Sequence, residues 1–251
     1  MFNDWSKDEE IKARKKSVDE LKGLALYLLG DYTVLKPKKV DITDFKKKVE
    51  RNYRKMYGIT IFSTEKEYLN DVLVGIKDGN APYIEQYYKD PIKQNFYEIK
   101  QREYIKASGI LEYIEKLPAS GDDACYIIDG KIFKGKDLKD KDRKMHKSVD
   151  FIARHKGRTI YGFQKFTEEN GGAQDNQYND VQDYAKSGKT IEDDSSLIFC
   201  VLDGGYYTSR YTKMGKGYQG TRIDYLNEEY GNGRIIAGNT DDFLKVMSNL
   251  E

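Results

Sequence analysis

The stretch SVDFIARHKGRTIYGFQKF, residues 148–166, decides the fold of this chain. Its apolar and β-branched side chains predict two strands, near residues 148–154 and 159–166. The segment 155–158 between them contains a glycine and predicts a tight turn. The sequence therefore indicates a β-hairpin in the second half of the chain.

Two charged side chains lie at the open end of this hairpin. Asp150 opens the first strand and Lys165 closes the second, at roughly equal distances from a turn centred on Gly157. Because side chains alternate between the faces of a strand, Lys165 points the same way as Phe163, and Gln164 points the opposite way. Mg²⁺ prefers oxygen ligands such as a carboxylate, and an ammonium group stabilises charge on a phosphate. The pair is a candidate metal and phosphate site; two ordinary solvated strand ends are the alternative.

The first third of the chain is predicted to be helical. Apolar side chains recur there at helical spacing, beginning after a capping-box pattern at Ser6 and Glu9. The predicted helices cover residues 6–30, 44–57 and 64–79, and a longer stretch, broken near Gly109, covers 91–117. We therefore assign residues 1–118 to a helical N-terminal region.

The pattern changes after residue 118. ACYIIDGKIFKG predicts a second hairpin with an Asp-Gly turn, and KDLKDKDRKMHK predicts a charged loop. A helix at 174–186, the buried strand SLIFCVLD, a polar loop at 204–222, a helix at 223–230, the strand GRIIAG and a helix at 241–250 follow. This order predicts an α/β (α+β) fold, with a mixed central sheet flanked by helices in residues 119–251.

Composition bounds the class of protein. The 251 residues carry a formal net charge of +1, which gives no global attraction to nucleic acid. No apolar run approaches the roughly 20 residues that span a bilayer, and the first residues lack the apolar stretch of a signal peptide. Cys125 and Cys200 lie in apolar segments without the paired spacing of a zinc site. We expect buried free thiols, a cytoplasmic location and no membrane partner.

The segment from about Lys147 to Leu250 resembles the core of the PD-(D/E)XK nucleases, the superfamily of type II restriction endonucleases. The matching pieces are SVDF, GFQKF and the helix from Gln174, in that order. KFTEENGGAQDNQYNDVQDY is similar to the segment after the catalytic lysine of the FokI cleavage domain. SLIFCVLDGGYYT and GNGRIIAGNTDDFLKVM resemble the later core strands, with a final helix. The resemblance implies a nuclease core at 119–251, with residues 1–118 serving recognition or dimerisation.

The resemblance also implies an activity. It is that of a Mg²⁺-dependent endonuclease that hydrolyses phosphodiester bonds of double-stranded DNA at a specific site, as a homodimer and without a nucleotide cofactor. Asp150 is expected to bind the metal and Lys165 to assist the attacking water or the scissile phosphate. Gln164 and Glu169 are the other expected catalytic residues.

Phe163 departs from the family pattern, because an acid is expected two residues before the lysine. Three explanations stay open. The acid has moved to another element, with Glu98, Glu103, Glu112, Glu115, Glu168 and Glu169 as candidates. A bulge near Gly162 turns the amide oxygen of Gln164 into the site. The site has lost its chemistry, which leaves a non-catalytic DNA-binding protein on a degenerate nuclease scaffold.

A polar loop over residues 204–222 is rich in tyrosine, glycine and basic residues and lacks acids. Cations neutralise phosphates, and phenolic hydroxyls donate hydrogen bonds to phosphate oxygens. The predicted DNA-binding residues are Tyr206, Tyr207, Arg210, Lys213 and Lys216 of this loop, together with Gln174 and Asn176. The alternative from another class of function is a cytosolic protein that uses this loop to bind a protein partner.

Overall fold

The computed structural model describes residues 1–34, 41–57, 62–88, 90–92, 96–168, 172–191, 193, 195–211 and 218–250. The chain divides into two compact units, one formed by Trp5–Phe96 and the other by Met1–Asp4 with Tyr97–Glu251. The boundary therefore lies between Phe96 and Tyr97, earlier in the chain than the boundary after residue 118 that the sequence predicts. The reason is that the chain from Tyr97 to residue 118 supplies a helix and an edge strand to the second unit.

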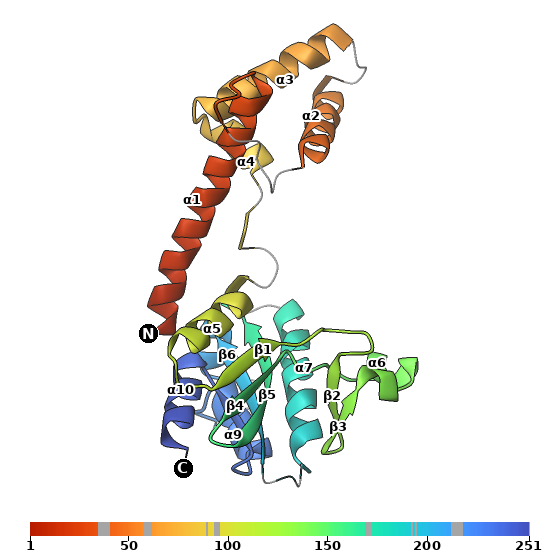
Figure 1. Ribbon diagram of the computed structural model, residues 1–251, viewed down its shortest axis with the longest axis vertical. Coiled ribbons are helices and arrows are strands. Elements are labelled where there is room, and N and C mark those ends of the chain that lie inside the picture. Colours follow the sequence, from red (N-terminus) through yellow and green to blue (C-terminus); the bar gives the residue numbers. More distant parts are fainter. Residues whose placement is uncertain are drawn as a thin grey trace. The chain divides into compact units, whose positions relative to one another are not determined.

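The first unit is helical (Figure 1). Its elements are α1 (Phe2–Leu28), α2 (Ile42–Tyr57), α3 (Phe62–Lys77) and α4 (Ala81–Tyr87). Leu24, Val49 and Ile76, on three of these helices, are buried in one apolar cluster, which Tyr87 of α4 joins. The three helices predicted from apolar spacing are therefore confirmed, whereas α4, only 7 residues long, was not predicted.

The second unit is built on a mixed five-stranded sheet. Its strands are β1 (Tyr113–Lys116), β4 (Phe151–His155), β5 (Arg158–Phe166), β6 (Ser196–Asp203) and β7 (Ile235–Gly238), in that spatial order. β1, β4 and β5 pair antiparallel, and β5, β6 and β7 pair parallel. The predicted hairpin of residues 148–166 is thus the centre of the sheet, and the predicted α/β class is confirmed.

Helices cover both faces of this sheet (Figure 1). On one face, Tyr178 and Val181 of α7 (Gly172–Gly188) and Leu226 of α9 (Arg222–Tyr230) pack in a cluster with Phe163. On the other face, Ile105 of α5 (Phe96–Ala107) and Phe243 of α10 (Thr240–Asn249) pack in a second cluster. β6 is buried along its whole length, as a central parallel strand covered on both faces should be.

Close packing explains the glycine in the middle of β5. Gly162 pairs with Phe151 of β4, and a Cβ atom at Gly162 would lie 2.0 Å from the Phe151 ring. The ring therefore fills the space that a side chain at 162 would take. The strands stay paired in unbroken register on both sides of this glycine, from Arg158 to Phe166.

The predicted second hairpin is confirmed as β2 (Cys125–Ile128) and β3 (Lys131–Lys134). Asp129 and Gly130 have φ angles of 47° and 75°, which a two-residue turn of this hand requires. The charged segment after it was predicted as a loop. It contains a 3₁₀ helix, η1 (Gly135–Asp137), and the short helix α6 (Asp140–Met145), so that prediction is wrong.

Two further predictions are wrong. Residues 91–117 do not form one interrupted helix, because α5 ends at Ala107 and the chain continues into strand β1. Gly109 has a φ of 67°, and β1 then gains its hydrogen bonds by pairing with β4, which overrides the helical spacing of its apolar residues. The polar loop at 204–222 contains a short helix, α8 (Gly205–Thr208).

Candidate active site

Asp150 lies at the open end of the hairpin, immediately before β4 begins at Phe151. Its backbone N–H donates to Gly162 O at 2.9 Å, and its Oδ2 accepts a hydrogen bond from Gln164 N at 2.8 Å. Phe151 and Gly162 are the last pair of the ladder at this end, so Asp150 lies just beyond it. The Lys165 ammonium acts to lower the pKa of the Asp150 carboxyl group, which shows that the two charges interact at the open end of the hairpin.

Lys165 meets an acid from another element. Its Nζ atom lies 3.4 Å from Glu98 Oε1, and 5.2 Å from the centre of the Phe163 ring. Glu98 stands in the first turn of α5, and its side chain is only 20% exposed. The structure thus brings Asp150, Lys165 and Glu98 together where β5 ends, β4 begins and α5 begins.

Burial raises the pKa of the Asp150 carboxyl group from 3.8 to about 6. The Glu98 carboxylate adds to the rise in pKa, whereas the Gln164 N–H, the Lys165 ammonium and the Arg102 guanidinium oppose it. A carboxylate in this state gains more from a bound cation than a solvated one does, because a cation restores the stabilisation that burial removes.

Phe163 is a core residue. Its side chain is 2% exposed, and its ring stacks on Tyr184 of α7 with the centres 4.8 Å apart. An acid here would lie in the apolar layer between β5 and α7. The position where the resemblance to the PD-(D/E)XK nucleases implies a second acid is therefore filled by packing, and Glu98 of α5 pairs with Lys165.

The other candidate glutamates lie elsewhere or outside the described residues. Glu103 pairs with Lys100 on the exposed side of α5, and Glu112 accepts the N–H of Lys156 at the opposite end of the hairpin. Glu115 bonds to the Tyr113 hydroxyl, and Glu168 accepts the N–H of Gly205. Glu169 lies outside the described residues. Among the described candidates, Glu98 is the one whose carboxylate pairs with Lys165.

The side chain of Gln164 is held by hydrogen bonds to helix α5, and β5 has no bulge at this position. The unbroken register of β5 rules out the bulge, and Gln164 is nonetheless buried, on the face of the sheet opposite Phe163. Its Oε1 accepts a hydrogen bond from Arg102 Nη1 at 2.5 Å, and its Nε2 donates to Gln101 Oε1 at 3.3 Å. A metal ion at Oε1 would lie against a guanidinium group. The predicted role of Gln164 as a ligand is therefore wrong, and its contacts anchor α5 to β5.

Two buried side chains that the sequence analysis missed complete this anchor. Gln101 donates through Nε2 to Asp203 Oδ2 at 2.6 Å and to Lys165 O at 3.4 Å. Asp203 ends β6 and accepts two more hydrogen bonds, from the N–H and hydroxyl of Thr240 at the start of α10. Burial raises the pKa of the Asp203 carboxyl group. The acid that closes the apolar strand SLIFCVLD was the sequence signal for it.

Two of the predicted DNA-binding residues are buried in the core. Tyr206 and Tyr207 are 1% and 0% exposed, so the prediction that they contact DNA is wrong. Both rings lie in the core: the Arg222 guanidinium lies 3.7 Å from the centre of the Tyr206 ring and donates to Tyr206 O, and the Tyr207 ring packs edge-on against Tyr206. Arg210 is exposed and its Nε donates to Tyr218 O.

The remaining predicted DNA contacts divide into two sets. Gln174 and Asn176 lie in the first part of α7, half-buried and exposed respectively. Lys213 and Lys216 lie outside the described residues. An interface with DNA along residues 204–222 therefore stays a prediction, without the two buried tyrosines.

The carboxylates at this site resemble part of the usual ligand set of Mg²⁺. Within the described residues, no group of three or more histidine, cysteine, aspartate or glutamate side chains is placed to hold a metal ion. The site offers two carboxylates, Asp150 and Glu98. Mg²⁺ is commonly bound by one or two carboxylates, with water and substrate phosphate as its other ligands. The residues therefore fit a Mg²⁺ ion that the substrate helps to hold, and they do not form a closed protein cage.

Comparison with known proteins identifies no relative of this chain. No protein-family model matches the chain, and a search of curated proteins finds no match. Among the helices of the described part of the chain, none has the length and apolar character to cross a bilayer.

Proposed function

We propose that this protein is a Mg²⁺-dependent endonuclease of the restriction type that hydrolyses double-stranded DNA. One observation carries the proposal. Glu98, Asp150 and Lys165 come from three separate segments of the chain and meet at the edge of the sheet where β5 and β6 end. In open α/β sheets this edge, outside the carboxyl ends of the strands, is where ligands bind.

The proposed roles follow from the charges. Asp150 and Glu98 would hold the metal ion, which when bound supplies positive charge beside the scissile phosphate and acidifies a water molecule. Lys165, which pairs with Glu98 at 3.4 Å, would supply the positive charge that faces the phosphate or the attacking water. Preorganised charges of this kind are among the largest contributions to catalysis.

The buried amides keep this geometry in place. Gln101 and Gln164 bond to each other and fix α5 against the ends of β5 and β6. Glu98 stands one turn before Arg102 on the same helix, so a shift of α5 would move the carboxylate away from Lys165. Small displacements at a catalytic site lower rates steeply, because the reacting groups must be aligned.

The assembly and setting belong to the same proposal. The described part of the chain holds one such site, and a pair of sites would cut both strands, so a homodimer is the simplest assembly. Cys125 and Cys200 are buried free thiols, as the sequence predicts, and they suit the reducing cytoplasm.

A second candidate, a non-catalytic DNA-binding protein, is favoured by one observation. The described residues lack a third metal ligand at the site, and Lys165 is already paired with Glu98. Incubation of supercoiled plasmid with the protein and Mg²⁺ separates the two functions. The nuclease predicts linear or fragmented DNA that EDTA and Asp150→Asn both abolish. The nuclease would be rejected by either of two results. One is equal cleavage by wild type and Asp150→Asn, and the other is DNA binding by both proteins without cleavage by either.

A further inference from the structure

The surface of α2 carries an excess of positive charge that the rest of the helical unit lacks. This 16-residue helix has six lysine or arginine side chains and two acidic ones. The 27-residue helix α1 has six of each sign. The excess is therefore a local property of α2, not of the composition of the unit.

These cations gather on one face of the helix. The buried residues of α2 are Phe45, Val49 and Tyr53, each one turn from the next. Lys47, Arg51 and Lys55 have the same spacing and are all exposed. At about 100° per residue, they project on the side away from the buried stripe. The helix thus presents a line of three cations about 12 Å long.

The acids of α2 do not neutralise this line. Glu50 pairs with Arg54, four residues further along the helix. Within the described residues, no carboxylate lies within 4.0 Å of a cationic nitrogen of Lys47, Arg51 or Lys55, the distance that defines an ion pair. Like charges four residues apart destabilise a helix. Folding therefore gives no reason for this arrangement, whereas a polyanionic partner does.

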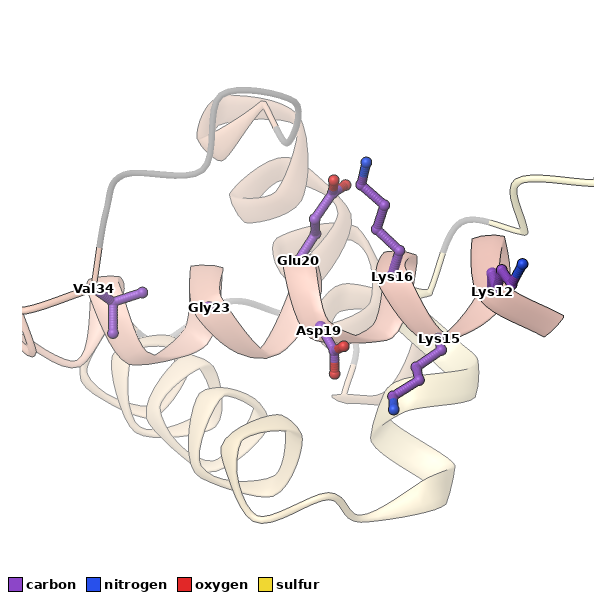
Figure 2. A pocket seen from close by; sticks show the side chains of 7 residues that line it. All are labelled: Lys12, Lys15, Lys16, Asp19, Glu20, Gly23 and Val34. Atoms are coloured by element: carbon purple, nitrogen blue, oxygen red, sulfur yellow. The ribbon is translucent and has the colours of Figure 1, made fainter. Parts of the chain in front are cut away.

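The basic surface extends to α3. Lys46 and Lys47 line a hollow of about 420 Å³ between α2 and α3, Lys66 of α3 lines it from the other helix, and its one acid, Glu50, is paired with Arg54. The hollow on α1 has a smaller excess of positive charge. Figure 2 shows Lys12, Lys15 and Lys16 there together with two acids, Asp19 and Glu20. That surface has the charge balance of an ordinary solvated helix.

We infer that the exposed face of α2, through Lys47, Arg51 and Lys55, binds the phosphate backbone of duplex DNA. The inference deepens the proposed function, on which the choice of DNA as the polyanion rests. Regularly spaced cations on a rigid helix match a regularly spaced row of phosphates. Such contacts carry no sequence information, and they position the duplex.

The test compares two triple variants in the full chain carrying Asp150→Asn, so that DNA stays intact. One combines Lys47→Gln, Arg51→Gln and Lys55→Gln; the control combines Lys12→Gln, Lys15→Gln and Lys16→Gln. Both remove three exposed charges from the helical unit, and glutamine keeps helix propensity. Circular dichroism checks that both fold. Fluorescence anisotropy with a labelled 30-base-pair duplex, titrated with salt, then gives the affinity and its salt dependence.

The expected result is that the α2 variant binds at least about tenfold more weakly, and that its slope of log affinity against log salt falls by about 2 to 3. The control should keep the affinity and slope of its parent. Equal losses in both variants, no loss in either, or binding of the parent to anionic vesicles but not to the duplex would overturn the inference. Plasmid cleavage by the same triples without Asp150→Asn judges the nuclease separately. Cleavage that the α2 triple leaves intact refutes only this inference, and tight α2-dependent binding without cleavage refutes only the nuclease.

Discussion

Glu98 and Lys165 lie 67 positions apart in the sequence, and their charged groups are 3.4 Å apart in the structure. Under the proposed function, this contact supplies the second acid that the phenylalanine at position 163 does not. The acid reaches the lysine from a helix that precedes the sheet. Four predictions follow from this arrangement and from the buried groups that support it.

The first concerns the acid on α5. Glu98→Gln keeps the size of the side chain and removes its charge, so cleavage of plasmid should slow by about 100-fold or more. Glu103→Gln is the matched control, since it lies on the same helix and pairs with Lys100 on the exposed side. Rates measured for both under identical Mg²⁺ concentrations decide the matter. Similar rates for the two variants would remove Glu98 from the site.

The second concerns the charge of Asp150. Its pKa is raised to about 6 in the folded protein, so the folded state binds more protons than the unfolded state between about pH 4 and 6. The free energy of unfolding therefore falls as pH rises through this window. Asp150→Asn removes the penalty and keeps an oxygen that can accept the Gln164 N–H. At pH 7.5 the variant should be more stable than wild type by about 1 to 3 kcal/mol, with no difference near pH 4.

Urea unfolding at both pH values measures this difference. An Asp150→Asn variant that is less stable than wild type at pH 7.5 would contradict the prediction. Added Ca²⁺ provides a further check at that pH. It should raise the melting temperature of wild type more than that of Asp150→Asn, because the variant keeps only one of the two proposed carboxylate ligands, Glu98.

The third concerns the phenylalanine. Phe163→Glu introduces the acid that the resemblance to the PD-(D/E)XK nucleases implies at this position, but it buries a charge against Tyr184. We expect a loss of at least about 3 kcal/mol in the free energy of unfolding and no gain in cleavage. Phe163→Leu, as a control, should cost about 1 to 2 kcal/mol. A folded Phe163→Glu protein with faster cleavage would show that the acid belongs at 163 after all.

The fourth concerns the buried anchor. Asp203→Ala leaves the hydroxyl and N–H of Thr240 and the amide of Gln101 without their acceptor. The expected cost is about 2 to 4 kcal/mol in the free energy of unfolding. Asp183→Ala, an exposed acid on α7, should change stability by less than about 0.5 kcal/mol. Chemical denaturation compares them, and equal stabilities would mean that the anchor contributes nothing.

Local patterns in the sequence predicted most of the fold. The hairpin of β4 and β5 follows from the alternation along residues 148–166, and the hairpin of β2 and β3 follows from the Asp129-Gly130 turn. Strand β6 follows from its run of apolar residues. Alternation also predicted that Lys165 and Phe163 share a face. These features depend on neighbours in sequence, which is why they could be read without the structure.

The rest depended on contacts between distant segments. The apolar residues of 110–116 have helical spacing, but pairing with β4 makes the end of this segment strand β1. Tyr206 and Tyr207 stand in a polar, glycine-rich stretch, yet both are buried, and Tyr206 packs against the buried side chain of Arg222, which no spacing rule indicates. Glu98 was one of six candidate glutamates, and only the packing of α5 against β5 selects it among those described.

The measurement that tests the central claim most directly is the anomalous scattering of a crystal soaked with Mn²⁺. If Asp150 and Glu98 form a metal site beside Lys165, a peak should lie within about 2.3 Å of an oxygen atom of each carboxylate. The same peak should vanish in a crystal of Asp150→Asn. A map with no peak between these two side chains, or with manganese bound only elsewhere on the chain, would contradict the claim.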